Sequence, residues 1–149
     1  MVNHSLKKKR GEVRYFLLHH GECPRSEGFH YRITPTATEN LLTESLRGQH
    51  PQTISIQVEG DFETQAPTNN QLSRLKNLIL DLKMRYPAAI VGGHRQVQRD
   101  RKTSCPGRKF PLREILDWSN RELLKLRDER ITRDLEAQYT FKAVSYTHL

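Results

Sequence analysis

Two histidines and one cysteine, His19, His94 and Cys105, are the residues of this chain whose types suit a metal site. His19 follows an apolar run typical of a strand, His94 follows a second such run, and Cys105 lies in the polar segment beyond it. Zinc prefers imidazole nitrogen and thiolate sulfur, and a catalytic zinc has three protein ligands and one open position. Two strand ends and one loop can converge on a point, so these residues are candidate zinc ligands. Their spacing alone is a weak signal, because a histidine after a strand more often has a structural role.

The chain has only two cysteines, Cys23 and Cys105, which are too few for a disulfide framework. The economical interpretation is that one cysteine belongs to the metal site and that Cys23 is incidental. A Cys23–Cys105 disulfide is the alternative, and it would remove the thiolate that zinc needs.

Short apolar runs predict the strands that would position these residues. They lie at 13–18, 29–33, 53–58 and 88–91. Within 53–58, three apolar side chains alternate with Ser55 and Gln57, which predicts a strand buried on one face only. Gly92 and Gly93 are expected to turn the chain from the last strand into His94. Within residues 34–52, the segment 38–46 is open between a helical turn and a hairpin arm.

Two helices complete the predicted elements. Thr68 is expected to cap the first helix, with Gln71 completing a capping box, and Pro87 should end it near Tyr86. Its predicted apolar stripe is Leu72, Leu75, Ile79, Leu82 and Met84. The second helix is expected to begin at Pro111 and to extend toward Leu135, followed by a weakly structured tail. The side chains that should face inward from this helix are Leu112, Ile115, Leu116, Leu123 and Leu124.

The order of these elements predicts an α/β fold, with a single domain built on a central mixed β-sheet flanked by α-helices. A chain of 149 residues fits one domain. We expect a basic flexible arm at 1–11, the folded domain at 12–118, and a charged helix and tail at 119–149.

The net charge of +8 and the pI near 9.8 favour polyanionic partners, although a solvated basic surface explains much of this charge equally well. Nucleic acid is not expected as a partner, because neither a helix-turn-helix pattern nor an aromatic platform accompanies the basic segments 7–10 and 121–133. No segment suits membrane insertion or a signal peptide. The sequence therefore predicts a cytoplasmic protein, released by lysis if it comes from a phage.

Short motifs around the candidate ligands occur in a fixed order along the chain. They are LLHH (17–20), GFHY (28–31), ISIQVEGDF (54–62), PTNNQ (67–71), GHRQV (93–97) and TSCPG (103–107). This series resembles the type 2 N-acetylmuramoyl-L-alanine amidase family, which includes peptidoglycan recognition proteins and amidase-type phage lysozymes. The resemblance covers roughly residues 13–118, and its most specific pieces are the last two motifs.

The resemblance implies a Zn²⁺ enzyme that hydrolyses the amide between N-acetylmuramic acid and L-alanine, with bacterial peptidoglycan or muropeptides as its partners. The ligands it implies are His19, His94 and Cys105, with His20 as a neighbour. An alternative is a peptidoglycan-binding recognition module of the same fold that is catalytically weak or inactive.

The resemblance also implies catalytic residues, and here the sequence departs from the family. Phe29 stands where relatives have a tyrosine, so we expect Tyr31, on the same face of a strand, to substitute for it or else to pack in the sheet. Gln57 stands where recycling relatives have a glutamate, which leaves Glu59 as a substitute.

Three further residues have expected positions near the substrate. Thr103 matches the family position that stabilises the oxyanion, whereas the adjacent Lys102 is more simply a solvated charge. His50 lies where relatives often have a histidine beside the substrate, and a surface position is equally compatible with the sequence.

Overall fold

The computed structural model describes the chain except residues 1–8, 10, 25–26, 98–101 and 148–149, and describes side chains as far as residue 139. In this part of the chain, a mixed sheet has the strand order β3-β2-β4-β1-β5. The strands are β1 (Tyr15–His20), β2 (Tyr31–Ile33), β3 (Thr38–Asn40), β4 (Thr53–Val58) and β5 (Ile90–Gly93). The helices are α1 (Asn69–Arg85), the 3-10 turn η2 (His94–Gln96) and α2 (Leu112–Thr147). The expected α/β class with a mixed sheet and helices is confirmed.

The strands β2, β4, β1 and β5 run parallel to one another. β1 pairs with β4 on one side and with β5 on the other, whereas β2 is parallel to β4 and antiparallel to β3. Because parallel strands end at the same edge of a sheet, the residues after β1 and β5 lie next to each other. The antiparallel pairing of β2 with β3 also shows which alternative holds for the segment 38–46: its beginning, residues 38–40, is a hairpin arm.

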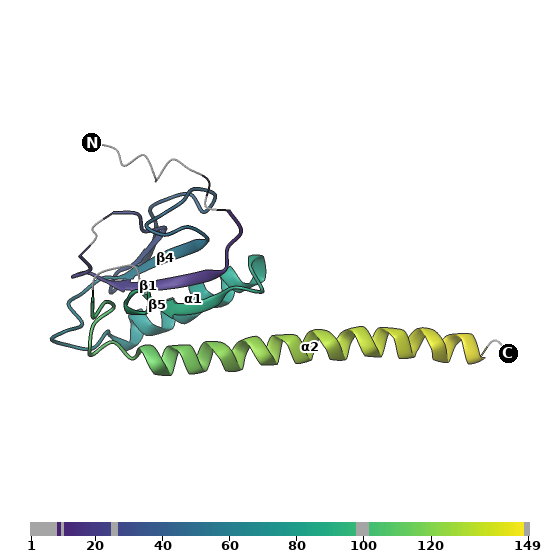
Figure 1. Ribbon diagram of the computed structural model, residues 1–149. Coiled ribbons are helices and arrows are strands. Elements are labelled where there is room, and N and C mark those ends of the chain that lie inside the picture. The colour runs from purple at the N-terminus through teal and green to yellow at the C-terminus, as the bar shows by residue number, and fades with distance from the viewer. Residues whose placement is uncertain (1–8, 10, 25–26, 98–101, 148–149) are drawn as a thin grey trace.

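Both long helices pack on one face of the sheet (Figure 1). This face contains alternate residues of the strands, and its fully buried side chains share one apolar core with the helices. The core includes Phe16, Leu18, Ile54, Ile56, Val58, Leu75, Ile79, Leu82, Leu112 and Ile115. The opposite face is left to connecting segments and to polar side chains.

The expectation that β4 is buried on one face only is wrong, since all six of its residues are buried. The second face is covered by the segments around residues 28–30 and 46–50. His30 ties them together, because its Nε2 donates to the carbonyl of Leu46 at 2.7 Å and its Nδ1 accepts from the backbone of Ser55 at 3.0 Å. The hydrogen bonds of this histidine satisfy polar groups that burial would otherwise leave unpaired.

The strand limits near the candidate ligands differ from the prediction. β1 includes both histidines, and β5 includes Gly92 and Gly93, which pair with Leu17 and Leu18 instead of turning the chain. A Cβ on Gly93 would lie 2.6 Å from the Leu112 side chain, so glycine permits α2 to pack directly against β5.

The first helix matches its predicted ends. Thr68 is the N-cap with a capping box to Gln71, and Tyr86 is the C-cap. Met84 was expected in the apolar stripe but is 80% exposed, whereas Leu78 is buried. Residues two positions apart do not share a helix face, so Met84 points away from the face of Leu82.

The second helix is longer than expected, because α2 continues to Thr147 through the segment predicted to be weakly structured. The inward position expected for Leu124 is wrong, since its side chain is 58% exposed. The buried Lys83 of α1 donates from Nζ to the carbonyl of Ser119 at 2.8 Å, and beyond this point α2 projects away from the sheet (Figure 1).

The predicted division of the chain stays a prediction. Most of the arm at 1–11 lies outside the described residues, and the boundary between 118 and 119 falls inside α2. Among the described residues, no helix combines the length and apolarity that a membrane span requires.

The core assignment predicts a sharp contrast between two leucines in the helices. Leu82→Ala should lower the free energy of unfolding by about 2–5 kcal/mol, because it opens a cavity in the core. Leu135→Ala, at a 59% exposed position, should change it by no more than about 0.5 kcal/mol. Urea unfolding followed by circular dichroism measures both variants, and a similar loss for Leu135→Ala would show that the distal part of α2 is packed.

Candidate metal centre

Four side chains that can bind a metal meet at the carboxyl edge of the sheet. They are His19, Cys23, His94 and Cys105, and one ligand atom from each lies within 4.8 Å of the other three. The structure therefore brings together the three residues singled out from the sequence. It adds Cys23, which the sequence analysis treated as incidental.

The end of β1 positions His19 and Cys23 together. His19 is fully buried in the strand, and a tight turn follows in which the backbone N–H of Cys23 donates to the carbonyl of His20 at 3.2 Å. The turn is attached to the next segment by Gly21, whose N–H donates to the carbonyl of Gly60 at 2.8 Å. As a result, Cys23 Sγ lies 3.6 Å from Nδ1 of His19.

His94 reaches the same point from the neighbouring strand. It is the first residue after β5 and is only 2% exposed. Gln96 fixes the turn, because its Oε1 accepts from the backbone N–H of Gly93 at 2.7 Å. The Nδ1 atom of His94 lies 3.3 Å from Cys23 Sγ.

Cys105 is held by a network of backbone hydrogen bonds. Its carbonyl accepts from Arg95 N–H at 2.8 Å, and its own N–H donates to Oγ1 of Thr103 at 3.1 Å. The loop continues through Gly107, which has a φ of +109° and lies so close to Phe62 that a Cβ would come within 2.6 Å of its backbone. Only glycine fits this conformation and contact, so Gly107 fixes the course of the chain after Cys105.

The protonation states of the cluster suit metal binding. Burial lowers the pKa of His19 to about 4, so its imidazole is neutral at pH 7 and keeps a lone pair for coordination. The hydrogen bond with Cys105, together with those from His19 and His94, lowers the pKa of Cys23. The same Cys23–Cys105 hydrogen bond and burial raise the pKa of Cys105. In the absence of a cation, the two thiols thus lose one proton readily, from Cys23, and the second proton, from Cys105, only with difficulty.

The distances between the donors fit a zinc ion. A tetrahedral zinc with bonds of about 2.3 Å to sulfur and about 2.1 Å to nitrogen holds such atoms about 3.6 Å apart. The two distances from Cys23 Sγ, to His19 and His94, are 3.6 and 3.3 Å.

Aromatic rings surround the cluster. Phe29 packs edge-on against His19 with ring centroids 5.0 Å apart, and the half-buried His50 lies 6.3 Å from His19 and 5.3 Å from His94. His20 points elsewhere, because its Nδ1 accepts from the backbone N–H of Phe62 at 3.1 Å. His50 therefore borders the cluster, and His20 does not contribute to it.

The structure does not bring Tyr31 to the cluster. Tyr31 pairs in register with Ile56, on the helix-packed face, whereas His19 pairs with Gln57 on the other face. The Tyr31 hydroxyl donates to the carboxylate of Glu44, and burial, followed by this hydrogen bond, raises its pKa to about 12. Because β2 begins at Tyr31, the alternation that was expected to link Phe29 and Tyr31 does not extend across the strand start. The geometry favours the packing alternative.

Gln57 lies on the same face as His19, and its Oε1 accepts from Nε of Arg32 at 2.7 Å. Its expected substitute, Glu59, lies beyond the end of β4 and is exposed. Thr103 contacts the Cys105 backbone through its hydroxyl oxygen, which leaves the hydroxyl proton available to another acceptor.

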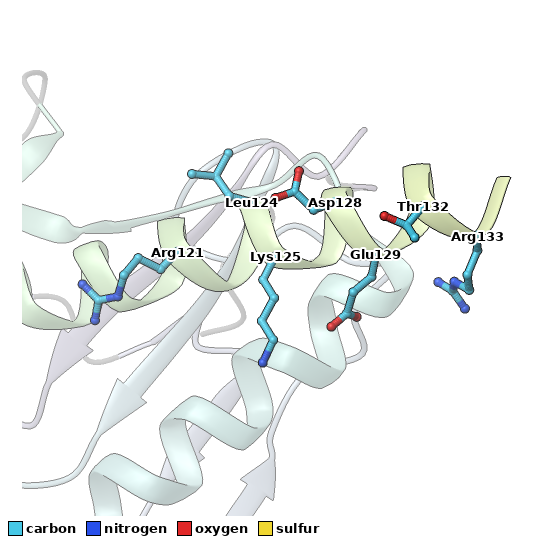
Figure 2. Close-up of a pocket in the computed structure, with 7 residues that line it drawn as sticks. All are labelled: Arg121, Leu124, Lys125, Asp128, Glu129, Thr132 and Arg133. Atoms are coloured by element: carbon cyan, nitrogen blue, oxygen red, sulfur yellow. The ribbon is translucent and has the colours of Figure 1, made fainter. Parts of the chain in front are cut away.

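A groove of about 510 Å³ begins beside His50 on the face of His19. Leu17, Thr53, Ile90 and Gly92 are among its lining residues, so it extends across β4, β1 and β5. A second hollow, of about 720 Å³, follows the exposed part of α2 and is lined by that helix alone (Figure 2). Its side chains carry mixed charges and include no histidine or cysteine, whereas the groove is lined by His50, whose ring centroid lies 5.3 Å from that of His94.

The fold and the cluster define a class: an α/β domain with a buried histidine–cysteine donor set at the carboxyl edge of its parallel strands. Residues 9–108 match the model of a protein family described as N-acetylmuramoyl-L-alanine amidase. The match spans more than half of the chain, and the chain belongs to this family. Among curated protein sequences, none matches the chain significantly.

Solved structures share the fold. An N-acetylmuramoyl-L-alanine amidase, LysC from Clostridium intestinale URNW, has 22% identity and a TM-score of 0.66, over 80% of this chain and 95% of its own. A Drosophila PGRP-LB mutant in complex with tracheal cytotoxin has 24% identity and a TM-score of 0.64, over 79% and 88%. The Ph2119 endolysin, from a Thermus scotoductus MAT2119 bacteriophage, has 21% identity and a TM-score of 0.57, over 71% and 85%. At these identities the likeness shows the fold.

The sequence analysis missed Cys23, although a signal was present. The residue lies four positions after His19, at the expected end of a strand and before a segment rich in turn-forming residues. A turn at this point returns the chain toward the strand end, and that geometry would have placed its thiol beside the first histidine.

The placement of Tyr31 leads to a prediction. Tyr31→Phe should lower the free energy of unfolding by about 1 kcal/mol, because the hydrogen bond to Glu44 is lost. Zinc content, measured by plasma emission spectroscopy, should equal that of the unmodified chain. Arg85→Gln, which removes an ion pair to the same carboxylate, is the matched control. A loss of zinc in Tyr31→Phe alone would contradict the position of Tyr31 on the opposite face.

Proposed function

We propose that this protein is a zinc-dependent N-acetylmuramoyl-L-alanine amidase, which hydrolyses the amide between N-acetylmuramic acid and L-alanine of peptidoglycan. The observation that carries the proposal is the buried donor cluster in a chain of the amidase family. The proposed zinc ligands are His19, His94 and Cys105, whose donor types suit that ion and whose ligand atoms lie within 4.8 Å of one another. Zinc bound there would polarise the scissile carbonyl and lower the pKa of the attacking water.

The residues around the ion would orient the substrate. His50 borders both the donor cluster and the groove of about 510 Å³, so we assign it to substrate contact. The apolar lining of the groove would accept the nonpolar parts of the stem peptide, and the volume lies in the usual range for a ligand site. The net charge of +8 would favour an anionic cell wall over a neutral surface.

Thr103 is the proposed oxyanion donor. Its hydroxyl oxygen accepts from Cys105 N–H at 3.1 Å, which fixes the side chain next to a proposed ligand and leaves its proton to donate. A donor fixed in this way stabilises a developing negative charge without having to reorganise. Tyr31 has no part in the proposed reaction, because its hydroxyl is bound to Glu44 on the other face.

The comparisons support the wall as the substrate. Relatives of the same fold include proteins described as endolysin amidases, and a recognition protein was solved with tracheal cytotoxin bound. The alternative of a recognition module without turnover is not favoured, although one outcome of the experiment below would establish it.

The first test combines metal content and wall hydrolysis. The purified chain should contain one zinc and release new N-terminal alanine from purified peptidoglycan, as measured by amino-group labelling. Cys105→Ala should weaken zinc binding and abolish alanine release, because a buried ligand is lost. Ser104→Ala changes the same loop without removing a donor and should retain zinc.

The outcomes separate the possible functions. Zinc without alanine release from several wall types would replace the amidase with a binding module. Zinc bound by Cys105→Ala as tightly as by the unmodified chain would remove Cys105 from the ligand set. A chain that takes up no zinc under reducing conditions would end the proposal.

A second test addresses Thr103. Thr103→Val removes the hydroxyl at nearly constant shape and should lower kcat by about 10²–10³-fold with little change in KM, as for other oxyanion donors. Thr103→Ser keeps the hydroxyl and should restore most of the rate. Zinc content must be equal in all three proteins; an unaltered kcat in Thr103→Val would leave Thr103 with only its contact to the Cys105 backbone.

A further inference from the structure

Cys23 lies within the cluster that the three proposed zinc ligands form. Its sulfur lies 3.6 Å from Nδ1 of His19 and 3.3 Å from Nδ1 of His94, and its ligand atom is within 4.8 Å of that of Cys105. A residue with no role in the site would not be expected to contact every other member. The two sulfur–nitrogen distances, 3.6 and 3.3 Å, are equal to or slightly below the separation of about 3.6 Å that a tetrahedral zinc imposes.

The geometry points to Cys23 as a fourth metal ligand, which closes the coordination shell of the ion in the resting protein. The resulting donor set has two histidines and two cysteines. Such a set is complete for a tetrahedral ion, whereas a catalytic zinc keeps one position for water or substrate. Cys23 occupies that position. The inference rests on the metal assignment in the proposed function, but it concerns a residue that is not among the three zinc ligands proposed there.

The two cysteines are attached to the fold in different ways. Cys105 is 1% exposed, and both its N–H and its carbonyl are hydrogen-bonded within the loop of 95–107. Cys23 is half-buried and lies in a turn, where its backbone N–H donates to the carbonyl of His20. Cys105 is therefore the fixed ligand, and Cys23 is the ligand whose thiolate can be displaced with the least change to the rest of the site.

This arrangement gives the proposed amidase a closed state. Displacement of the Cys23 thiolate would open the fourth position of a cluster whose two histidines lie beside His50. A closed shell also predicts tighter metal binding than three ligands provide. Cys23 would thus favour metal retention at the expense of turnover.

The experiment counts thiolates on a Co²⁺ ion bound to the full chain. Near-ultraviolet absorption from thiolate-to-cobalt charge transfer increases with the number of bound sulfurs. The unmodified chain, reduced and loaded with one Co²⁺, should show roughly twice the absorption per cobalt of Cys23→Ala. Glu22→Gln, in the same turn, should match the unmodified chain. Circular dichroism of each metal-loaded protein verifies that it is folded.

Two further measurements make the test decisive. Chelator competition should show weaker Co²⁺ binding in Cys23→Ala at unchanged stoichiometry, and X-ray absorption of the zinc form should give two sulfurs in the unmodified chain and one in the variant. Zinc-loaded Cys23→Ala should release alanine from peptidoglycan faster than the unmodified chain does.

The possible failures are distinguishable. Equal charge-transfer absorption and one sulfur in both proteins would overturn the fourth ligand and leave the amidase proposal intact if alanine is released. A disulfide between Cys23 and Cys105 in the metal-loaded protein, detected by mass spectrometry, would also overturn it. Two sulfurs with no alanine release from either protein would establish the ligand and reject the amidase. Two sulfurs with equal rates of release would reject the closing of the site.

Discussion

Four side chains that can bind a metal, within 4.8 Å of one another, are the constraint on which the rest of the structure depends. They come from three segments that are far apart in the sequence: the end of β1 with its turn, the start of η2, and the loop that carries Cys105. Parallel pairing of β1 with β5 places the first two side by side. The third is drawn in by hydrogen bonds from the 3-10 turn and by the close approach of Gly107 to Phe62.

The two faces of the sheet differ, and this difference allows the cluster to be largely buried without lying in the apolar core. Both helices pack on the face of Phe16 and Leu18, where the core provides the burial that holds the sheet together. The other face is covered by connecting segments and contains His19, Ser55 and Gln57 in buried positions. Two polar groups on that face have partners within the protein, because His30 accepts from the backbone N–H of Ser55 and Arg32 donates to the side chain of Gln57.

The same low-polarity surroundings set the chemistry of the donors. Burial keeps His19 neutral, and the neighbouring imidazoles together with Cys105 favour a thiolate at Cys23. Without a cation the second thiol is held protonated, since two adjacent thiolates would repel each other in a buried site. A divalent ion removes this conflict, which is why metal binding and proton release are linked in sites of this kind.

The sequence by itself determined the elements whose signals are local. The limits of β4 and the caps of α1 follow from alternation and from Thr68, Gln71 and Pro87, and the chemistry of His19, His94 and Cys105 was visible in their residue types. Only the tertiary structure decided which side chains meet. Cys23 lies in the cluster because a turn reverses the chain after β1. Tyr31 lies away from the site because β2 begins at that residue, so Phe29 is outside the alternation of the strand. Likewise, Met84 and Leu124 are apolar but exposed, because burial depends on where a helix contacts the sheet and not on hydrophobicity alone. Strand starts, turns and helix contacts are set by long-range pairing, and a pattern of single residues does not contain them.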